Sequence, residues 1–287
     1  MLALIDLRRR IKSVKNTQQI TQAMKTVSTA KFKKSQRTVV ESRSHWHNLP
    51  GLAERASGWA GRQASPLLDR REENKADVMV IGSDKGLCGA FNSNLLARAT
   101  AFLEEKSPSA EIGLILIGKK AVNFFKKQSY PVLRAHAEKV EKLTLKDLRE
   151  TARFLMRRYA FARTDAVYVI YNEFKSILAP RITVVPILPV ALPEGEEFGS
   201  AWPPDWMPDS GRFLQSLLPL YVETQVCHCF FESLAAEQAA RMMAMENATK
   251  NAEELISDLI LVLNKIRQAS ITKELLEIMT AVEALAK

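Results

Sequence analysis

The chain has 287 residues, of which 47% are hydrophobic and 25% are charged, and its formal net charge is +9. This composition is that of an ordinary globular protein and excludes the disordered and collagen-like classes. No run approaches the roughly 18 apolar residues that a transmembrane helix needs. The chain starts with a short apolar lead before a basic run, the reverse of a secretory signal, so we expect no targeting segment. The three cysteines favour a reducing compartment.

The positions of glycine and proline divide the chain into three parts. All 11 glycines lie between Gly51 and Gly211, and all 12 prolines lie between Pro50 and Pro219. Because glycine costs about 1 kcal/mol and proline about 3 kcal/mol inside a helix, the two ends of the chain are candidates for long helices. We predict an N-terminal coiled-coil helix over 1–58 and a C-terminal one over 212–287, on either side of a globular middle.

The N-terminal segment predicts an amphipathic and strongly basic helix. Its apolar residues first recur at spacings of three and four, and polar residues at 18 and 21 then interrupt the pattern. We expect the apolar face to continue in a shifted register at Ile20, Met24 and Val27. Residues 1–49 hold eleven Lys or Arg against two acidic residues, a net charge of +9. The basic face of the first turns consists of Arg8, Arg9, Arg10, Lys12 and Lys15.

Residues 75–192 predict an α/β domain. Four runs are apolar and β-branched, as buried strands are, and they cover 76–84, 111–118, 165–174 and 181–190. The segments between them predict helices over 94–105, 119–128 and 145–162. Strands that alternate with helices are typical of a Rossmann-like, doubly wound and mostly parallel sheet. A proline-rich loop over 193–211 follows the domain.

Two motifs of the middle and C-terminal parts could hold a ligand. GSDKGLCGAFNSNL (82–95) follows a predicted strand, but its glycines fit neither G-x-G-x-x-G nor a P-loop, and a tight turn needs such glycines without any ligand. In CHC (227–229) the two cysteines diverge by about 200° on a helix and cannot share a metal ion. No catalytic motif occurs either. We expect no catalytic residue, no cofactor and no metal.

The C-terminal segment predicts one helix of a coiled coil. Apolar residues follow alternating spacings of three and four in two series, Met245, Ala248, Ala252, Leu255, Leu259, Val262, Ile266, Ala269 and then Ile271, Leu275, Ile278, Val282, Leu285. Residues 220–287 hold six basic and ten acidic side chains, a net charge of −4. Since the N-terminal helix is basic, we predict that the two helices form a long antiparallel two-helix coiled coil.

The basic N-terminal helix leaves other functions open. Its charge density would give salt-sensitive binding of phosphates, which favours a nucleic-acid-binding coiled-coil protein with an α/β head. An acidic protein partner would satisfy the same charge. An α/β enzyme that uses the middle domain is a third hypothesis.

Three stretches carry a resemblance to a known family. They are DLRRRIKSVKNTQQITQAMKTVSTAKFKKSQ at the start, SDKGLCGAFNSNL in the middle, and ESLAAEQAARMMAMENATKNAEELI followed by LNKIRQASITKELLEI near the end. In this order they resemble the gamma subunit of F-type ATP synthases, and together they span the chain. VKNTQQIT and RQASITKELLEI are the most family-specific parts.

This resemblance implies a function without catalysis by the chain itself. The gamma subunit is the central rotor shaft of the complex, and it couples transmembrane ion flow, expected here to be of protons, to ATP synthesis or hydrolysis on the beta subunits. Its expected partners are the alpha and beta subunits of the catalytic head, the epsilon subunit and the membrane c-ring. Nucleic acid is not among them, and contact with the membrane is only peripheral, through the complex. With no transit peptide, we expect the cytoplasmic face of a bacterial inner membrane.

The resemblance also implies contact residues. Met24 and Lys25 align with the part of the shaft near an acidic loop of the beta subunit, which the basic helix would complement. The other expected rotor–stator contacts are polar positions in the last third of the chain, namely Arg241, Arg267, Gln268, Thr272 and Glu274. From the residues alone, a solvated face of a coiled coil is the favoured interpretation of all of these positions.

Overall fold

The computed structural model describes residues 2–60, 65–137, 140–176, 181–191 and 210–285. The chain divides into two compact units, one formed by Met1–Ser28 with Met242–Lys287 and the other by Thr29–Arg241. Two long helices, α1 (Leu2–Ala60) and α5 (Ser210–Leu285), contribute to both units. No helix in the described ranges has a stretch that is long and apolar enough to cross a bilayer.

The larger unit is built on a five-stranded sheet with the order β3-β2-β1-β4-β5. Strands β1 (Lys75–Ile81), β2 (Glu111–Ile117), β3 (Val132–His136) and β4 (Ala166–Glu173) are parallel, and β5 (Arg181–Leu188) pairs antiparallel with β4. Strands β1 and β2 are buried over nearly their whole length, as strands covered on both faces are. The predicted α/β fold with a mostly parallel sheet is confirmed.

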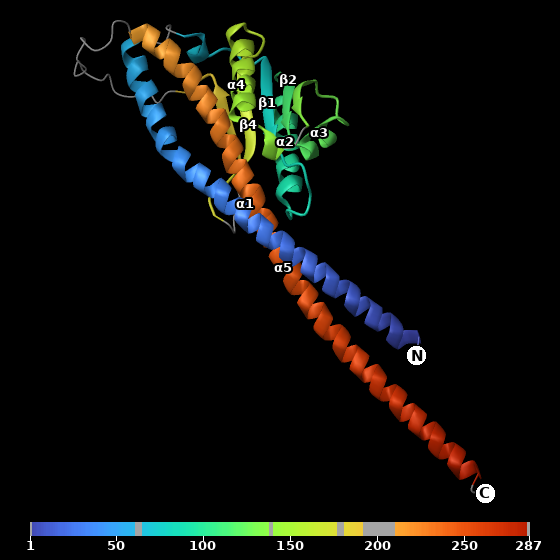
Figure 1. Cartoon of the computed structure of the whole chain (residues 1–287). Helices are drawn as coiled ribbons and strands as arrows, with labels where there is room; N and C mark the ends of the chain where they lie inside the picture. The colour runs from blue at the N-terminus through green and yellow to red at the C-terminus, as the bar shows by residue number, and fades with distance from the viewer. Residues whose placement is uncertain (1, 61–64, 138–139, 177–180, 192–209, 286–287) are drawn as a thin grey trace. The chain divides into compact units, whose positions relative to one another are not determined.

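Helices cover both faces of this sheet. On one face, Met79 and Ile81 of β1 pack with α4 (Leu145–Ala160) and with the part of α5 in this unit. On the other face, Val78 and Val80 pack with α2 (Phe91–Lys106) and α3 (Lys119–Phe125). The alternation of side chains along β1 therefore places one apolar core on each face of the sheet. Figure 1 shows α4 and α2 on opposite sides of β1. Two short 3₁₀ helices, η2 (Pro66–Leu68) and η3 (Val140–Lys142), complete the unit.

The edge strands of the sheet depart from the buried pattern. The sequence predicts no strand at β3, because the polar residues Arg134 and His136 interrupt its apolar residues. In the structure, none of the side chains of β3 is fully buried. In β5, Pro186 is tolerated because an edge strand has no second neighbour that needs its missing N–H group. Both edges are therefore more polar or more irregular than the central strands.

The two long helices extend beyond the stretches without glycine and proline. Helix α1 continues through Pro50 and Gly51, and α5 continues through Pro219. Around Pro219 the side chains of Leu214, Leu217, Leu218 and Val222 are buried in the core, and this burial offsets the cost of proline in the helix. Of the loop expected over 193–211, residues 193–209 lie outside the described residues, and the last two belong to α5.

Candidate functional site

In the smaller unit, α1 and α5 pair along their length (Figure 1). Gln18 Nε2 donates to Glu253 Oε1 at 3.0 Å, and Lys25 Nζ contacts Glu246 Oε1 at 3.0 Å. Between these two contacts, the Oγ1 atoms of Thr21 and Thr249 are 2.8 Å apart and buried. As the residue number rises along α1, that of its partner on α5 falls. The pair is antiparallel, as predicted.

An unbroken heptad series of buried or half-buried residues runs along each of the two helices. On α1 it consists of Leu4, Leu7, Ile11, Val14, Gln18, Thr21, Lys25 and Ser28. On α5 it consists of Met245, Thr249, Ala252, Ile256, Leu259, Leu263, Ile266 and Ser270. These spacings of three and four are those of a coiled coil. Where Gln18 to Ser28 of α1 pair with Met245 to Ile256 of α5, the seam is polar on α1 and, apart from Thr249, apolar on α5.

The shifted register expected on α1 is wrong. Ile20 and Val27 are 60% and 56% exposed, whereas Thr21 and Ser28 are buried. Gln18 and Thr21 stay in the seam because their hydrogen-bonding groups find partners there, either across the seam or on their own helix. Ile20 and Val27 therefore lie outside the seam, on the same stripe of the helix as the half-buried Met24.

On α5 the predicted seam is correct at every second position only. Leu255 and Val262 are exposed, and the seam runs through the residues that follow them, Ile256 and Leu263. The predicted and the observed series share Met245, Ala252, Leu259 and Ile266, and they differ at the positions between these residues. Because α5 is apolar on more than one side, periodicity alone could not decide between the two series.

Helix α5 continues past the start of α1. Gln18 pairs with Glu253, and both helices rise by about 5.4 Å per turn, so equal numbers of residues span equal lengths on α1 and α5. Leu2, at the start of α1, therefore lies opposite about residue 268 of α5. The described residues beyond that point have no helix of this chain beside them. They nevertheless include six exposed apolar side chains, those of Ile271, Leu275, Leu276, Ile278, Met279 and Val282.

The residues of the smaller unit predicted to contact partners fall into three groups. The basic face is exposed on α1 at Arg8, Arg9, Arg10, Lys12 and Lys15. The polar set is exposed on α5 at Arg267, Gln268, Thr272 and Glu274. Met24 and Lys25 are half-buried, and Lys25 already pairs with Glu246.

Arg241 belongs to the larger unit and does not lie on a solvated face. It is 8% exposed, its Nη2 donates to Glu237 Oε1 at 2.8 Å, and the same atom reaches the carbonyl oxygens of Lys85 and Gly86 at 3.5 and 3.4 Å. It thus holds the turn after β1. Leu87, the next residue of this turn, has a φ of +63° and is 63% exposed. Sequence patterns could not single out Leu87, because neither hydrophobic periodicity nor a motif reveals that a leucine has a left-handed backbone conformation.

In the same turn, the groups that could bind a phosphate already form hydrogen bonds with the chain itself. Asp84 Oδ1 accepts from the backbone N–H of Lys119, the first residue of α3, at 3.1 Å, and its Oδ2 accepts from Val140 N at 2.6 Å. Ser83 N and Oγ both bond Asn92 Oδ1. A carboxylate of the chain itself therefore occupies the N-terminus of α3, the position where a helix attracts anions.

The three cysteines lie in surroundings that suppress thiol chemistry. Burial raises the pKa of Cys88 and Cys229, and it raises the pKa of Cys227 to about 11. Cys229 is buried in the core beside Tyr171, whereas Cys227 lines a pocket formed by α1, α4 and α5. Thiols with raised pKa values stay protonated near neutral pH and are poor nucleophiles.

Comparison with solved structures shows the same fold. A chain in the cryo-EM structure of the Euglena gracilis mitochondrial ATP synthase in rotational state 3 matches with a TM-score of 0.67 and 20% sequence identity, covering 99% of this chain and 94% of that chain. A chain in the rotor structure of the same complex in rotational state 1 matches with a TM-score of 0.62 and 19% identity, covering 94% of this chain and 99% of that one.

Comparison of sequences covers the whole chain. A family model described as ATP synthase matches residues 3–285. The chain is 42% identical to the ATP synthase gamma chain of Pelotomaculum thermopropionicum over 99% of this chain and all of that protein. It is 39% identical to the ATP synthase gamma chain of Desulforamulus reducens over 98% of each. The chain therefore belongs to the ATP synthase gamma chain family.

Proposed function

We propose that the chain works as the central rotor shaft of an ATP synthase. In this role it couples transmembrane ion flow to ATP synthesis or hydrolysis on the beta subunits and carries out no chemistry itself. The observation that carries the proposal is the end of α5, which exposes Ile271, Leu275, Ile278 and Val282 beyond the point where the described part of α1 begins.

A single helix that exposes these apolar side chains needs other protein surfaces to cover them. From about residue 268 to Leu285 it is roughly 25 Å long, and isolated helices of that length are marginal in water. Its apolar residues face several directions, so a single partner helix would leave some of them in water. A ring of alternating alpha and beta subunits that encloses the helix would cover them from all sides.

The charged surface of α1 fits the same arrangement. Arg8, Arg9 and Arg10 are exposed together with Lys12 and Lys15, and an acidic loop of the beta subunit would complement this basic face. We assign rotor–stator contacts to Met24, Lys25, Arg241, Arg267, Gln268, Thr272 and Glu274. Arg241 would act indirectly, by holding the turn that presents Leu87. Ile20 and Val27 join this set as exposed apolar neighbours of Met24.

The remaining partners follow from the same role. We assign the α/β domain to the foot of the shaft, against the epsilon subunit and the c-ring. The complex would place the chain peripherally on the cytoplasmic face of a bacterial inner membrane. The names of the relatives do not support the alternative of a nucleic-acid-binding protein.

Reconstitution tests the proposal. The purified chain alone should hydrolyse no ATP, and its addition to a hexamer of alpha and beta subunits should raise the turnover of the hexamer. A disulfide between an introduced cysteine at Ile20 and one in a facing beta subunit should stop turnover, and reduction should restore it. Full activity with the disulfide intact would contradict a turning shaft.

A further inference from the structure

Helix α4 of the larger unit presents a row of arginines. Arg149, Arg153 and Arg157 are all exposed, and their spacing of four residues places them on one face over about 12 Å. Arg134 of β3 lies beside this row and contacts Glu150 at 3.9 Å. The role of the shaft described above uses none of these side chains.

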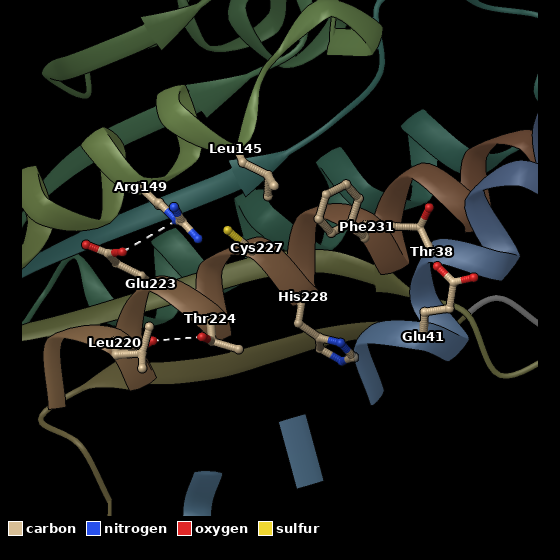
Figure 2. Close-up of a pocket in the computed structure, with 10 residues that line it drawn as sticks. All are labelled: Thr38, Glu41, Leu145, Arg149, Leu220, Glu223, Thr224, Cys227, His228 and Phe231. Carbon is tan, nitrogen blue, oxygen red and sulfur yellow. Dashed lines mark hydrogen bonds and ion pairs between the residues drawn. The ribbon is translucent and has the colours of Figure 1, made fainter. Parts of the chain in front are cut away.

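A buried carboxylate on α5 orients two of the arginines. Glu223, which is only 7% exposed, accepts from Arg153 Nε at 2.7 Å. It also lies 3.7 Å from Arg149 Nε, and Figure 2 draws this second contact. Both ion pairs are closest at Nε, and no hydrogen bond in the described part of the chain uses the terminal N–H groups of these two guanidinium groups. Arg157 has no ion pair among the described residues. A guanidinium fork held in this way is prepared to bind a carboxylate through two hydrogen bonds.

Hollows flank the row of arginines on the side of α5. One, of about 450 Å³, is lined by Leu145 and Arg149 of α4, by residues of α5 that include Leu220, Cys227 and Phe231, and by Thr38 and Glu41 of α1 (Figure 2). Leu145 and Leu220 are about half exposed at its mouth. This hollow can therefore take an apolar side chain next to a cation.

The second hollow lies next along the same two helices. Its volume is about 740 Å³, and its lining includes Arg134, Arg153, Arg157 and, on α5, Pro219. Adjacent residues of α5, Pro219 and Leu220, thus line one hollow each. The groove between α4 and α5 is cationic at one end and amphipathic at the other.

We propose that the groove between α4 and α5 is a docking site for an acidic segment of a partner protein, one with carboxylates spaced along about 12 Å and an apolar residue at one end. The carboxylates would bind the terminal N–H groups of Arg149, Arg153 and Arg157, and the apolar residue would enter the hollow at Leu145 and Leu220. A phosphate or a single lipid headgroup would neutralise one or two of the arginines and leave the apolar mouth empty. The linear spacing therefore favours a peptide.

The test uses the full chain and a fluorescent 14-residue peptide with Glu at three positions four residues apart and Leu at one end. A peptide of the same composition in scrambled order is the reference. The test variant combines Arg149→Gln, Arg153→Gln, Arg157→Gln and Glu223→Gln, so that Glu223 is not left buried without its cations. A matched variant, Arg98→Gln with Lys127→Gln on α2 and after α3, changes the net charge by the same amount on the other side of the sheet.

Fluorescence anisotropy should show that the patterned peptide binds the chain at least tenfold more tightly than the scrambled one. The test variant should lose this preference, and the matched variant should keep it within a factor of two. If the chain bound both peptides equally, or if both variants lost the preference for the patterned peptide to the same extent, the proposal would be overturned. Binding would then depend on net charge alone. Vesicles with 30% anionic lipid provide a further arm. If the test variant loses vesicle binding but keeps peptide binding, the groove is a lipid site and the proposal is wrong.

Discussion

The interiors of the two units differ in how much apolar surface they bury and in the polar groups they contain. In the larger unit, the two faces of the sheet bury continuous apolar cores, and the charged pair inside, Asp77 with Arg158, is bidentate at 2.6 and 3.0 Å. In the smaller unit, the seam between α1 and α5 consists of one heptad series from each helix, and it contains the paired threonines Thr21 and Thr249. The larger unit can therefore support its own fold, whereas the smaller one depends more on what surrounds it.

The difference also separates the ways in which the units meet a partner. The smaller unit leaves apolar residues exposed along α5 and a basic face exposed along α1. The larger unit buries most of its apolar residues in its cores, and its exposed features are scattered, such as Leu87, Phe161 and the arginines of α4. Substitutions that weaken the interior of either unit measure how far this contrast extends.

Loss of the buried ion pair should have the largest effect. Asp77→Ala leaves the guanidinium group of Arg158 without its carboxylate in a largely buried position, so we expect the free energy of unfolding to fall by about 3–5 kcal/mol. Urea denaturation followed by circular dichroism measures this change. Asp77→Asn keeps a hydrogen-bond acceptor and should cost less; an equal cost for both variants would argue that the charge is unimportant.

Truncation of one leucine in each unit compares the two interiors directly. Leu155 of α4 is fully buried against the sheet, and Leu155→Ala should destabilise the larger unit by about 2–5 kcal/mol. Leu259 lies in the narrower seam, and Leu259→Ala should cost about 1–2 kcal/mol, because less apolar surface is lost there. Hydrogen exchange resolved by peptide distinguishes the two effects. Equal costs would remove the contrast between the units.

The threonine pair in the seam should be replaceable. Val at both positions 21 and 249 substitutes apolar groups of similar shape for both hydroxyls, so the change in stability should lie within about 1 kcal/mol, and towards greater stability. Thr21→Val alone leaves the Thr249 hydroxyl bonded to Met245 O and should be close to neutral. Amide exchange over residues 14–28 reports the strength of the pair. Faster exchange in the double variant would show that the hydroxyls hold the helices together.

The smallest effect should come from His136 and depend on pH. Burial and the charge of Arg134 lower the pKa of His136, whose Nε2 is 2.9 Å from Thr151 Oγ1. The unfolded chain, with an ordinary pKa of about 6.5, therefore binds this proton more readily than the folded chain. The contribution of His136 to stability is full above that pKa and is lost as the pH falls below it.

Melting temperatures at pH 7.5 and 5.5 test this sign. The chain should lose stability on acidification, and His136→Gln should lose less. An unchanged difference between the two pH values in the variant would exclude His136 as a source of the pH dependence.

The sequence was informative where residues are buried on all sides. Four apolar runs predicted the strands that make up most of the sheet, because a strand covered on both faces has no room for polar residues. It failed at β3, an edge strand whose Arg134 and His136 resemble a loop. The long helices were predicted from missing breakers, but Pro50 and Pro219 lie inside them, because packing in the larger unit outweighs the local preference.

The candidate contact surface was harder to predict than the fold. Periodicity assigned Ile20 and Val27 to the seam, and the structure exposes both and buries Thr21 and Ser28 instead; the hydroxyl group of Thr21 finds its partner inside the pair. Arg241 was expected on a solvated face, and only tertiary structure brings it to the carbonyl oxygens of Lys85 and Gly86. Sequence patterns indicate which helices pair, and they do not determine which neighbouring residue enters the seam.

The most direct test of the shaft is to watch it turn. Lys127 is exposed after α3, and a cysteine introduced there can carry a bead while the native cysteines remain buried or half-buried. In a complex fixed to a surface through its alpha and beta subunits, the bead should rotate in one direction when ATP is added and stop when ATP is removed. A bead that stays still while the same complexes hydrolyse ATP would contradict the central claim.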